Sequence, residues 1–154
     1  MTTNPTGRDI ADALALLLRR STRARLHTHL AAGLGEAVDG LTYPLISGLD
    51  RTGPCSAARL GPEIGLDRTT VTRRADRLER AGLLERRPDP DDARATLLAL
   101  TDRGHLAVAA ARQRLAAAIE DSLASWPPAD ARDFARHLRR FAAEGPFADG
   151  PGRP

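Results

Sequence analysis

Lysine is absent from this 154-residue chain, so arginine supplies all 23 of its basic side chains. Aromatic residues make up only 3% of the sequence, which means that a core must be built mainly from alanine, leucine, valine and isoleucine. A single cysteine, Cys55, excludes an internal disulfide and any zinc site with several cysteine ligands. No run of consecutive apolar residues is longer than six, far short of the ~18 that a membrane-spanning helix requires.

The rest of the composition is that of one globular domain. A chain of 154 residues lies within the ~100–200 of a typical domain, and 42% of its residues are hydrophobic, which is enough for a core. Asp9 and Asp12 precede the first apolar run, residues 13–18, where a secretory signal would carry basic side chains. We therefore expect a soluble protein of the cytoplasm.

Residue patterns typical of enzymes are missing from the sequence. There is no glycine-rich phosphate loop, no Ser-His-Asp motif and no obvious pair of catalytic carboxylates. His27 and His29 are two residues apart, so on a helix their side chains would diverge instead of chelating a metal. We expect no catalytic activity, no metal and no cofactor. Cys55 is expected to be an ordinary small side chain, because nothing beside it in the sequence clearly activates a thiol.

Apolar residues recur with a helical period through most of the chain. We expect helices over residues 8–32, 43–52, a short stretch from 57, 68–81, 102–126 and 129–144. Four of the starts carry a residue that can cap a helix: Thr42, Ser56, Asp67 and Thr101. Gly82 stands where the helix over residues 68–81 would end. Gly61 and Pro62 interrupt the short helix, which we therefore expect to be kinked or to begin later.

A two-stranded ribbon is expected after Gly82, because the apolar period changes there from about 3.6 to 2. The strands cover residues 83–87 and 95–100, and the polar sequence PDPDDAR joins them as a turn. Residues 145–154 hold three prolines and three glycines, so we expect a disordered tail.

Positive charge is concentrated in residues 68–87. Seven arginines and three acids lie there, a surplus of four (7 − 3), whereas the whole chain carries only +3. On a helical wheel Val71, Ala75 and Leu78 share one narrow sector, and Thr69 and Arg73 lie on the opposite side, with other arginines beside them. Short hydroxyls near a helix N-terminus followed by arginines suit a helix that reads the DNA major groove.

An arginine-rich helix face standing alone is more often simply a solvated surface. Here it follows a short capped helix and a turn, and it precedes a ribbon with a polar tip. This combination is typical of a winged helix-turn-helix. The segment LDRTTVTRRADRLERAGLLERRPDPDDARATLLALTDRG, residues 66–104, closely resembles the recognition helix, wing and following helix of the MarR family of bacterial transcription regulators.

The resemblance implies a mainly α fold with a two-stranded β wing, in which residues 40–101 bind DNA and the long helices within 8–39 and 102–144 form a homodimer. It implies a repressor of a pseudo-palindromic operator, and it places the wing arginine in the minor groove. The residues that match DNA-contacting positions are Arg68, Thr69, Thr70, Thr72, Arg73, Arg74, Arg77, Arg87, Asp92 and Arg94. Members of the family often bind small aromatic anions between the dimer helices and the winged helix, where His29, Tyr43 and Arg59 could contact such an effector.

Two other functions stay open at this point. The winged helix could bind an acidic protein partner through its arginines, in which case duplex DNA would not be discriminated by sequence. Alternatively the protein could bind a small molecule and have only incidental DNA affinity, which operator selectivity on the order of 10³ or more over random DNA would exclude. The sequence names neither the operator nor the ligand.

Overall fold

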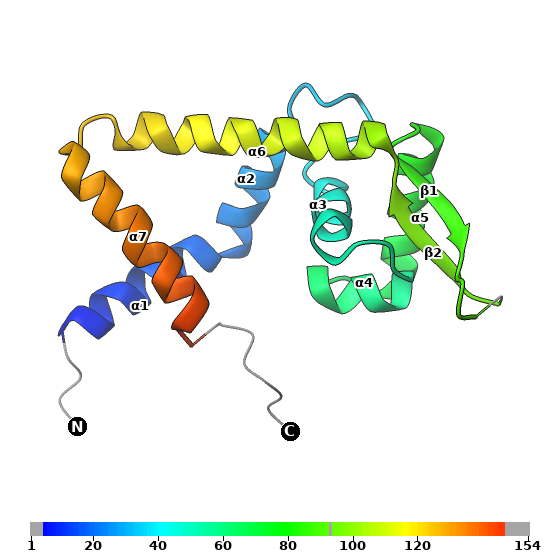
Figure 1. Ribbon diagram of the computed structural model, residues 1–154, viewed down its shortest axis with the longest axis horizontal. Coiled ribbons are helices and arrows are strands. Elements are labelled where there is room, and N and C mark those ends of the chain that lie inside the picture. Colours follow the sequence, from blue (N-terminus) through cyan, green and yellow to red (C-terminus); the bar gives the residue numbers. More distant parts are fainter. Residues whose placement is uncertain (1–4, 93, 147–154) are drawn as a thin grey trace. The chain divides into compact units, whose positions relative to one another are not determined.

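The computed structural model describes residues 5–92 and 94–146, and these are mainly helical (Figure 1). The chain divides into two compact units, Met1–Leu115 and Ala116–Pro154, each of which is described by itself. In chain order the elements are α1 (Pro5–Leu18), α2 (Arg20–Ala31), α3 (Tyr43–Thr52), α4 (Ala57–Ile64), α5 (Arg68–Arg80), β1 (Leu84–Pro88), β2 (Thr96–Leu100), α6 (Asp102–Leu123) and α7 (Pro128–Glu144). The predicted fold class is confirmed.

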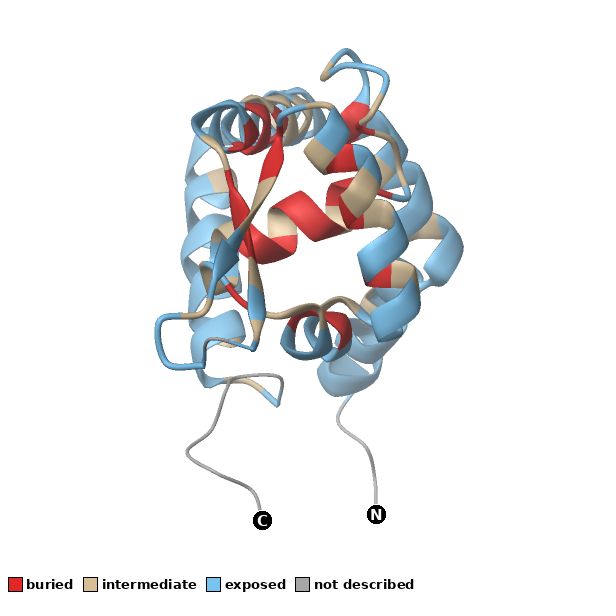
Figure 2. Cartoon of the chain, turned by 90° about the vertical axis from the view of Figure 1, so that its right-hand side faces the viewer, coloured by how far each residue is buried: buried red, intermediate tan, exposed pale blue. Residues whose placement is uncertain are grey.

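Helices α3, α4 and α5 supply most of the core of the first unit. Seven of their side chains are at most 2% exposed: Leu45, Ile46, Leu49, Leu60, Val71, Ala75 and Leu78. The last three form the apolar stripe predicted for α5, and Figure 2 shows the buried residues in red on the inward parts of the helices beside the two strands. Gly48 allows α3 and α4 to approach closely, because a Cβ atom there would lie 2.7 Å from Cγ2 of Ile64.

Three of the four predicted helix caps are confirmed. Oγ of Ser56 accepts a hydrogen bond from the Arg59 N–H (3.2 Å), and Oδ1 of Asp67 accepts one from the Thr70 N–H (2.8 Å). At the start of α6, Oγ1 of Thr101 accepts a hydrogen bond from the Gly104 N–H (3.1 Å). Each bond satisfies a backbone donor that the first turn of a helix leaves without a partner. These short-range signals fix where α4, α5 and α6 begin.

The prediction for Thr42 is wrong in its mechanism, although α3 does begin at Tyr43. The Thr42 side chain makes no capping bond to α3. Its hydroxyl instead donates to the Ala37 carbonyl (2.8 Å) and accepts from the Asp39 N–H (2.9 Å), so it is used within the preceding turn.

The wing is an antiparallel pair of strands in which Leu84 lies opposite Leu100 and Pro88 lies opposite Thr96. The predicted ribbon is confirmed, with both strands starting one residue later than expected. A third short segment joins it, because Cys55 forms a β-bridge with Leu98: the Cys55 N–H donates to the Leu98 carbonyl (3.1 Å), and the Leu98 N–H donates back (2.8 Å). This contact was not predicted from the sequence, and it holds the segment before α4 against β2.

The single helix predicted over residues 8–32 is divided into α1 and α2. Arg19 interrupts it with an extended backbone (φ −55°, ψ 136°). Arg19 and Arg23 are like charges at i and i+4, and Ser21 and Thr22 have low helix propensity, so a continuous helix is weak at this point. No residue of α1 is buried, and therefore no tertiary packing compensates for that weakness.

Two further helix boundaries differ from the prediction. The short helix α4 begins at Ala57, so Pro62 does not delay its start; the proline lies inside the helix. The helix that follows the wing ends at Leu123 instead of Trp126. Trp126 precedes a proline, which disfavours helical backbone, and the chain turns there with the Trp126 N–H bonded to the Leu123 carbonyl (2.9 Å).

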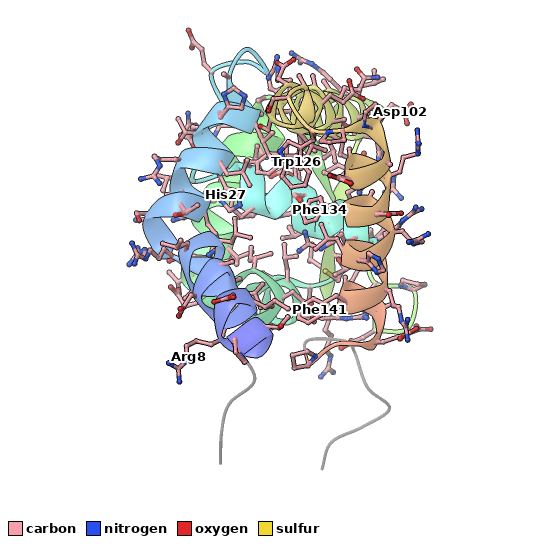
Figure 3. The ribbon with its side chains drawn as sticks, turned by 90° about the vertical axis from the view of Figure 1, so that its left-hand side faces the viewer. Arg8, His27, Asp102, Trp126, Phe134 and Phe141 are labelled. Atoms are coloured by element: carbon pink, nitrogen blue, oxygen red, sulfur yellow. The ribbon has the colours of Figure 1, made fainter. Side chains whose placement is uncertain are left out.

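The second unit contains the end of α6, a turn and α7. Pro128 opens α7 at a first-turn position, where the missing N–H costs little. The Trp126 and Phe134 rings pack with centroids 5.5 Å apart. Figure 3 shows Phe134 and Phe141 on one side of α7, and Phe134 and Leu138 are exposed. Within the described part of the chain, no helix combines the length and apolarity needed to cross a membrane. Residues 147–154 of the predicted tail lie outside the described residues.

Candidate nucleic-acid interface

The start of α5 is fixed by Asp67. Besides capping the Thr70 N–H, its carboxylate accepts a hydrogen bond from the Thr70 hydroxyl (2.7 Å). That side-chain bond, together with the backbone bonds, holds the pKa of Asp67 below its usual value. The hydroxyl of Thr70, which was predicted to contact DNA, therefore donates its hydrogen bond within the protein. Thr72 likewise donates to the Arg68 carbonyl (3.0 Å), so each hydroxyl presents only acceptor lone pairs to a ligand.

The outward side of the first two turns of α5 carries Arg68, Thr69 and Arg73. All three are exposed, and none of their side chains bonds to another described residue. Val71 and Ala75 on the opposite side are fully buried, so the packing of the helix aims the exposed side chains away from the core. This is the arrangement that the helical wheel predicted. It leaves two guanidinium groups and one hydroxyl available to base edges or phosphates.

Arg74 and Arg77, also predicted to contact DNA, bond instead to the segment between α2 and α3. Nη1 of Arg77 forms an ion pair with Oδ2 of Asp39 (2.6 Å), and its Nη2 donates to the Glu36 carbonyl. Nη1 of Arg74 donates to the Leu41 carbonyl (2.6 Å). Arg74 and Arg77 are thus held by contacts within the protein, whereas the side chains of Arg68 and Arg73 bond to no other described residue.

Arg86, on β1, was not among the predicted site residues. Its guanidinium bridges two acids of α5, Asp76 (2.6 Å to Oδ1) and Glu79. The side chain of Arg86 is 29% exposed, whereas those of Asp76 and Glu79 are 47% and 38% exposed, so the ion pairs are only partly shielded from water. Arg86 fixes β1 of the wing against α5. The sequence feature that could have indicated a partner for Arg86 is the pair of acids Asp76 and Glu79, which lie at i and i+3 in an arginine-rich helix.

Two hydrogen bonds that involve aspartates and the backbone order the wing tip. Oδ1 of Asp92 accepts a hydrogen bond from the Arg94 N–H (2.9 Å), and the Asp89 N–H donates to the Ala95 carbonyl (3.1 Å). Arg87, the other predicted wing contact, is exposed and paired with Glu85. Asp92 therefore positions Arg94 through the backbone of the turn.

A cleft of about 330 Å³ joins the N-terminal end of α4, the first turns of α5 and the wing. Three arginines line it, Arg68, Arg86 and Arg94, together with Ser56, Ala57, Ala58, Thr72, Ala95, Thr96 and Leu98. No acid is part of this lining. The structure thus brings together three predicted DNA contacts that lie up to 26 residues apart in sequence, Arg68, Thr72 and Arg94. Guanidinium groups beside the N-terminus of a helix are suited to hold a phosphate.

Within the described part of the chain, no hydrogen bond, ion pair or ring contact joins the three residues suggested for an effector. Tyr43 is buried in α3, whereas His29 and Arg59 are exposed on α2 and α4. The ring that packs against Tyr43 belongs to His27, with centroids 5.5 Å apart. Burial, followed by the charge of Arg23, lowers the pKa of His27, so the neutral imidazole is favoured. The aromatic pair is therefore His27 and Tyr43.

Metal and thiol chemistry find little support in the described residues. No group of three or more histidine, cysteine, aspartate or glutamate side chains there could hold a metal ion. Cys55 is buried, with its sulfur 3.6 Å from the Thr52 hydroxyl. Buried thiols of this kind behave as small apolar side chains.

Comparison with known proteins agrees with this geometry. A family model described as MarR family matches residues 43–96, from the first residue of α3 to the first residue of β2. The uncharacterized HTH-type transcriptional regulator YxaD of Bacillus subtilis is 31% identical over 100 residues, which cover 65% of this chain and 70% of the relative.

Two solved structures resemble the chain over most of its length. RV1404 from Mycobacterium tuberculosis superposes with a TM-score of 0.71 at 26% identity, covering 95% of this chain and 99% of that protein. The PcaV transcriptional regulator from Streptomyces coelicolor, solved in complex with its natural ligand, superposes with a TM-score of 0.53 at 28% identity, covering 84% and 95%.

Proposed function

The chain belongs to the MarR family of transcriptional regulators, and we propose that it represses transcription by binding a pseudo-palindromic operator as a homodimer. The observation that carries the proposal is the cationic cleft in which Arg68 of the recognition helix and Arg94 of the wing converge. A protein that grips one phosphate between these two elements presents the start of α5 to the adjoining major groove and the wing to the minor groove.

The predicted contacts take different parts in this proposal. Arg73 and Thr69 face outward, bond through their side chains to no other described residue, and read base edges, with Arg73 forming the bidentate contact that arginine makes to guanine. Arg68 and Thr72 lie at the cleft and bind the phosphate backbone. Arg94 enters the minor groove, where a narrow A·T-rich groove attracts a guanidinium.

The homodimer is proposed from the apolar side chains that the terminal helices leave exposed. Leu16 and Leu17 on α1 are 53% and 63% exposed, and Leu138 on α7 is 51% exposed. An amphipathic helix of a soluble protein normally buries such a stripe. Two-fold pairing would bury the stripes and place two recognition helices on half-sites about 10 bp, or a multiple of it, apart.

A small aromatic anion is proposed as the signal that releases the operator. The support is the partly exposed His27 ring, which packs against Tyr43. His29, two residues further along α2, and Arg59 on α4 are the additional polar groups proposed to bind the anion. The similar PcaV protein was solved in complex with its natural ligand, which supports the proposal of a ligand site in this chain.

The test begins with the selection of bound duplexes from a random pool. The affinity of the protein for the best duplex is then compared with its affinity for random DNA at several salt concentrations. We expect a two-fold-symmetric consensus and a selectivity of at least about 10³. A screen of aromatic acids for release of that duplex then tests the effector. Equal binding to all duplexes would contradict operator recognition and would favour an acidic protein partner or a small-molecule carrier instead.

A further inference from the structure

The segment between α2 and α3 reaches the recognition helix through three hydrogen bonds. Two come from Arg77, to the Asp39 carboxylate and the Glu36 carbonyl, and one comes from Arg74, to the Leu41 carbonyl. The partners are 33 to 41 residues apart in sequence. Arg74 and Arg77 thus connect α5 to a segment that lies outside the helix-turn-helix itself.

Hydrogen bonds from its own turn hold Asp39 in place independently of Arg77. Its Oδ1 accepts hydrogen bonds from the Leu41 N–H (2.8 Å) and the Thr42 N–H (2.9 Å), which leaves Oδ2 for the guanidinium. Thr42 is 1% exposed and its hydroxyl bonds to the Ala37 carbonyl, so the turn is anchored in the core. Although partial burial opposes it, the pKa of Asp39 is lowered by the Thr42, Arg77 and Leu41 bonds. The carboxylate therefore offers Arg77 a charged and rigid partner.

We infer that Asp39 is a specificity-determining positioning residue for DNA recognition, and that it acts through Arg77 to fix the rotation of α5. The inference rests on the proposed function. It also assigns Arg74 and Arg77, which the sequence placed among the DNA contacts, to contacts inside the protein.

The need for such a restraint follows from the geometry of reading bases. The apolar face of α5, Val71, Ala75 and Leu78, fixes the helix by contacts that have no preferred direction. A helix with side chains has a radius of about 5–6 Å, so a rotation of 10° moves a side-chain tip by about 1 Å. A hydrogen bond tolerates only a few tenths of an ångström around its ordinary distance. The directional hydrogen bonds at Arg74 and Arg77 restrain the rotation of α5, and this restraint holds the side chain of Arg73, one turn before Arg77, in position to read a base.

The experiment measures the full-length protein on its selected duplex and on single-base variants of that duplex, at several salt concentrations. The variants are Asp39→Asn, Arg77→Gln and the double substitution, and Arg80→Gln is the control because Arg80 is exposed on the same helix without a described partner. Asp39→Asn keeps Oδ1 as an acceptor for the Leu41 and Thr42 N–H groups, and it replaces the charged acceptor Oδ2 that faces Arg77 with a neutral NH2 donor. Circular dichroism verifies that each variant is folded.

Asp39→Asn and Arg77→Gln should each reduce discrimination at the base read by Arg73 on the order of tenfold. The double variant should be no worse than Arg77→Gln alone, because Asp39 acts only through Arg77. Removing an acid by itself would strengthen DNA binding at every sequence, so a loss of discrimination in Asp39→Asn cannot come from the change in net charge. The salt dependence of Arg77→Gln should match that of the unsubstituted protein.

Three results would overturn the inference while leaving the proposed function intact. These are unchanged discrimination in Asp39→Asn, additive effects in the double variant, and a salt slope that falls in magnitude by nearly two units in Arg77→Gln, which would place Arg77 on a phosphate in each subunit. If Asp39→Asn fails to fold, Arg77→Lys serves instead, since it keeps the charge and loses the two-pronged contact; undiminished discrimination in that variant would overturn the inference. No sequence preference in the unsubstituted protein would overturn both proposals together.

Discussion

The winged-helix region and the terminal helices differ in how much apolar surface a single chain buries. Helices α3 to α5 and the two strands carry most of the fully buried side chains. Helices α1 and α7 contain no buried residue, although both are amphipathic and expose large apolar side chains such as Leu17 and Leu138. The winged-helix region therefore has a complete core within one chain, whereas the terminal helices carry exposed apolar surface that the proposed dimer would cover.

The largest expected effect lies in the core. Leu78 is 0% exposed on α5, and Leu78→Ala should lower the free energy of unfolding by about 2–5 kcal/mol, because it removes buried methyl groups and leaves a cavity. Urea unfolding followed by circular dichroism measures the change. The matched control is Leu106→Ala on α6, whose side chain is 71% exposed and whose loss should change stability by less than about 0.5 kcal/mol. Equal losses in the two variants would contradict the division drawn here.

Dimerisation should depend on the exposed apolar residues of the terminal helices instead of on the buried core. Leu138→Glu places a charge on the exposed stripe of α7 and should weaken dimerisation by more than about tenfold, a cost of at least 1.4 kcal/mol, because the acid would have to be desolvated in the interface. Analytical ultracentrifugation over a concentration series measures it. Arg136→Glu, on the other side of the same helix, is the control and should leave association nearly unchanged. A monomeric unsubstituted protein would remove the proposed role of α1 and α7.

Base reading should depend on Arg73. Its removal in Arg73→Ala should cost about 1–3 kcal/mol on the best duplex and relax the preference at one base position of each half-site. Stability should change little, because the side chain is exposed and bonds to no other described residue. Binding to a panel of single-base variants measures both effects. An unchanged profile would move the readout to Thr69 or to another residue of the exposed face.

Short-range features of this fold could be predicted from the sequence, and long-range ones could not. The caps at Ser56, Asp67 and Thr101 involve residues three apart, so the local pattern contains all the information needed. The Cys55–Leu98 bridge and the Asp39–Arg77 pair join residues that are distant in the chain, and they depend on how the helices pack. The helical pattern placed Arg77 on the outward side of α5, but only the packing supplied the partners of Arg74 and Arg77.

The break at Arg19 was missed for a related reason. An apolar period that continues through residues 13–24 predicts one helix, and no proline or glycine marks an interruption. The weak propensity of Ser21 and Thr22 decides the outcome only because α1 has no buried contact to hold it in line with α2.

A smaller effect on affinity, with a distinct salt signature, is expected at the wing. Arg94→Ala removes one cation per subunit, hence two per dimer, so the slope of log affinity against log salt should fall in magnitude by nearly two units at ~0.9 per phosphate. Preference for A·T-rich flanks should fade, while the base preferences of the major groove survive. Asp92→Ala should reproduce part of the loss, because Asp92 fixes the Arg94 backbone. Unchanged affinity, salt slope and flank preference in Arg94→Ala would show that the wing is not a DNA contact.

The smallest effect should be a pH dependence of stability that arises from His27. Burial lowers the pKa of His27 below 6.5, and Arg23 lowers it further, so in the window between the folded pKa and 6.5 the unfolded chain binds more protons than the folded one. Stability must therefore decline as the pH falls from 6.5 through that window. His27→Phe keeps a ring against Tyr43 and cannot titrate, so its urea midpoint should change less than that of the unsubstituted protein between pH 7.5 and about 5. His137→Phe, on exposed α7, is the control for the other histidines. The same pH dependence in His27→Phe and the unsubstituted protein would mean that the His27 ring is as free to protonate in the folded chain as in the unfolded one.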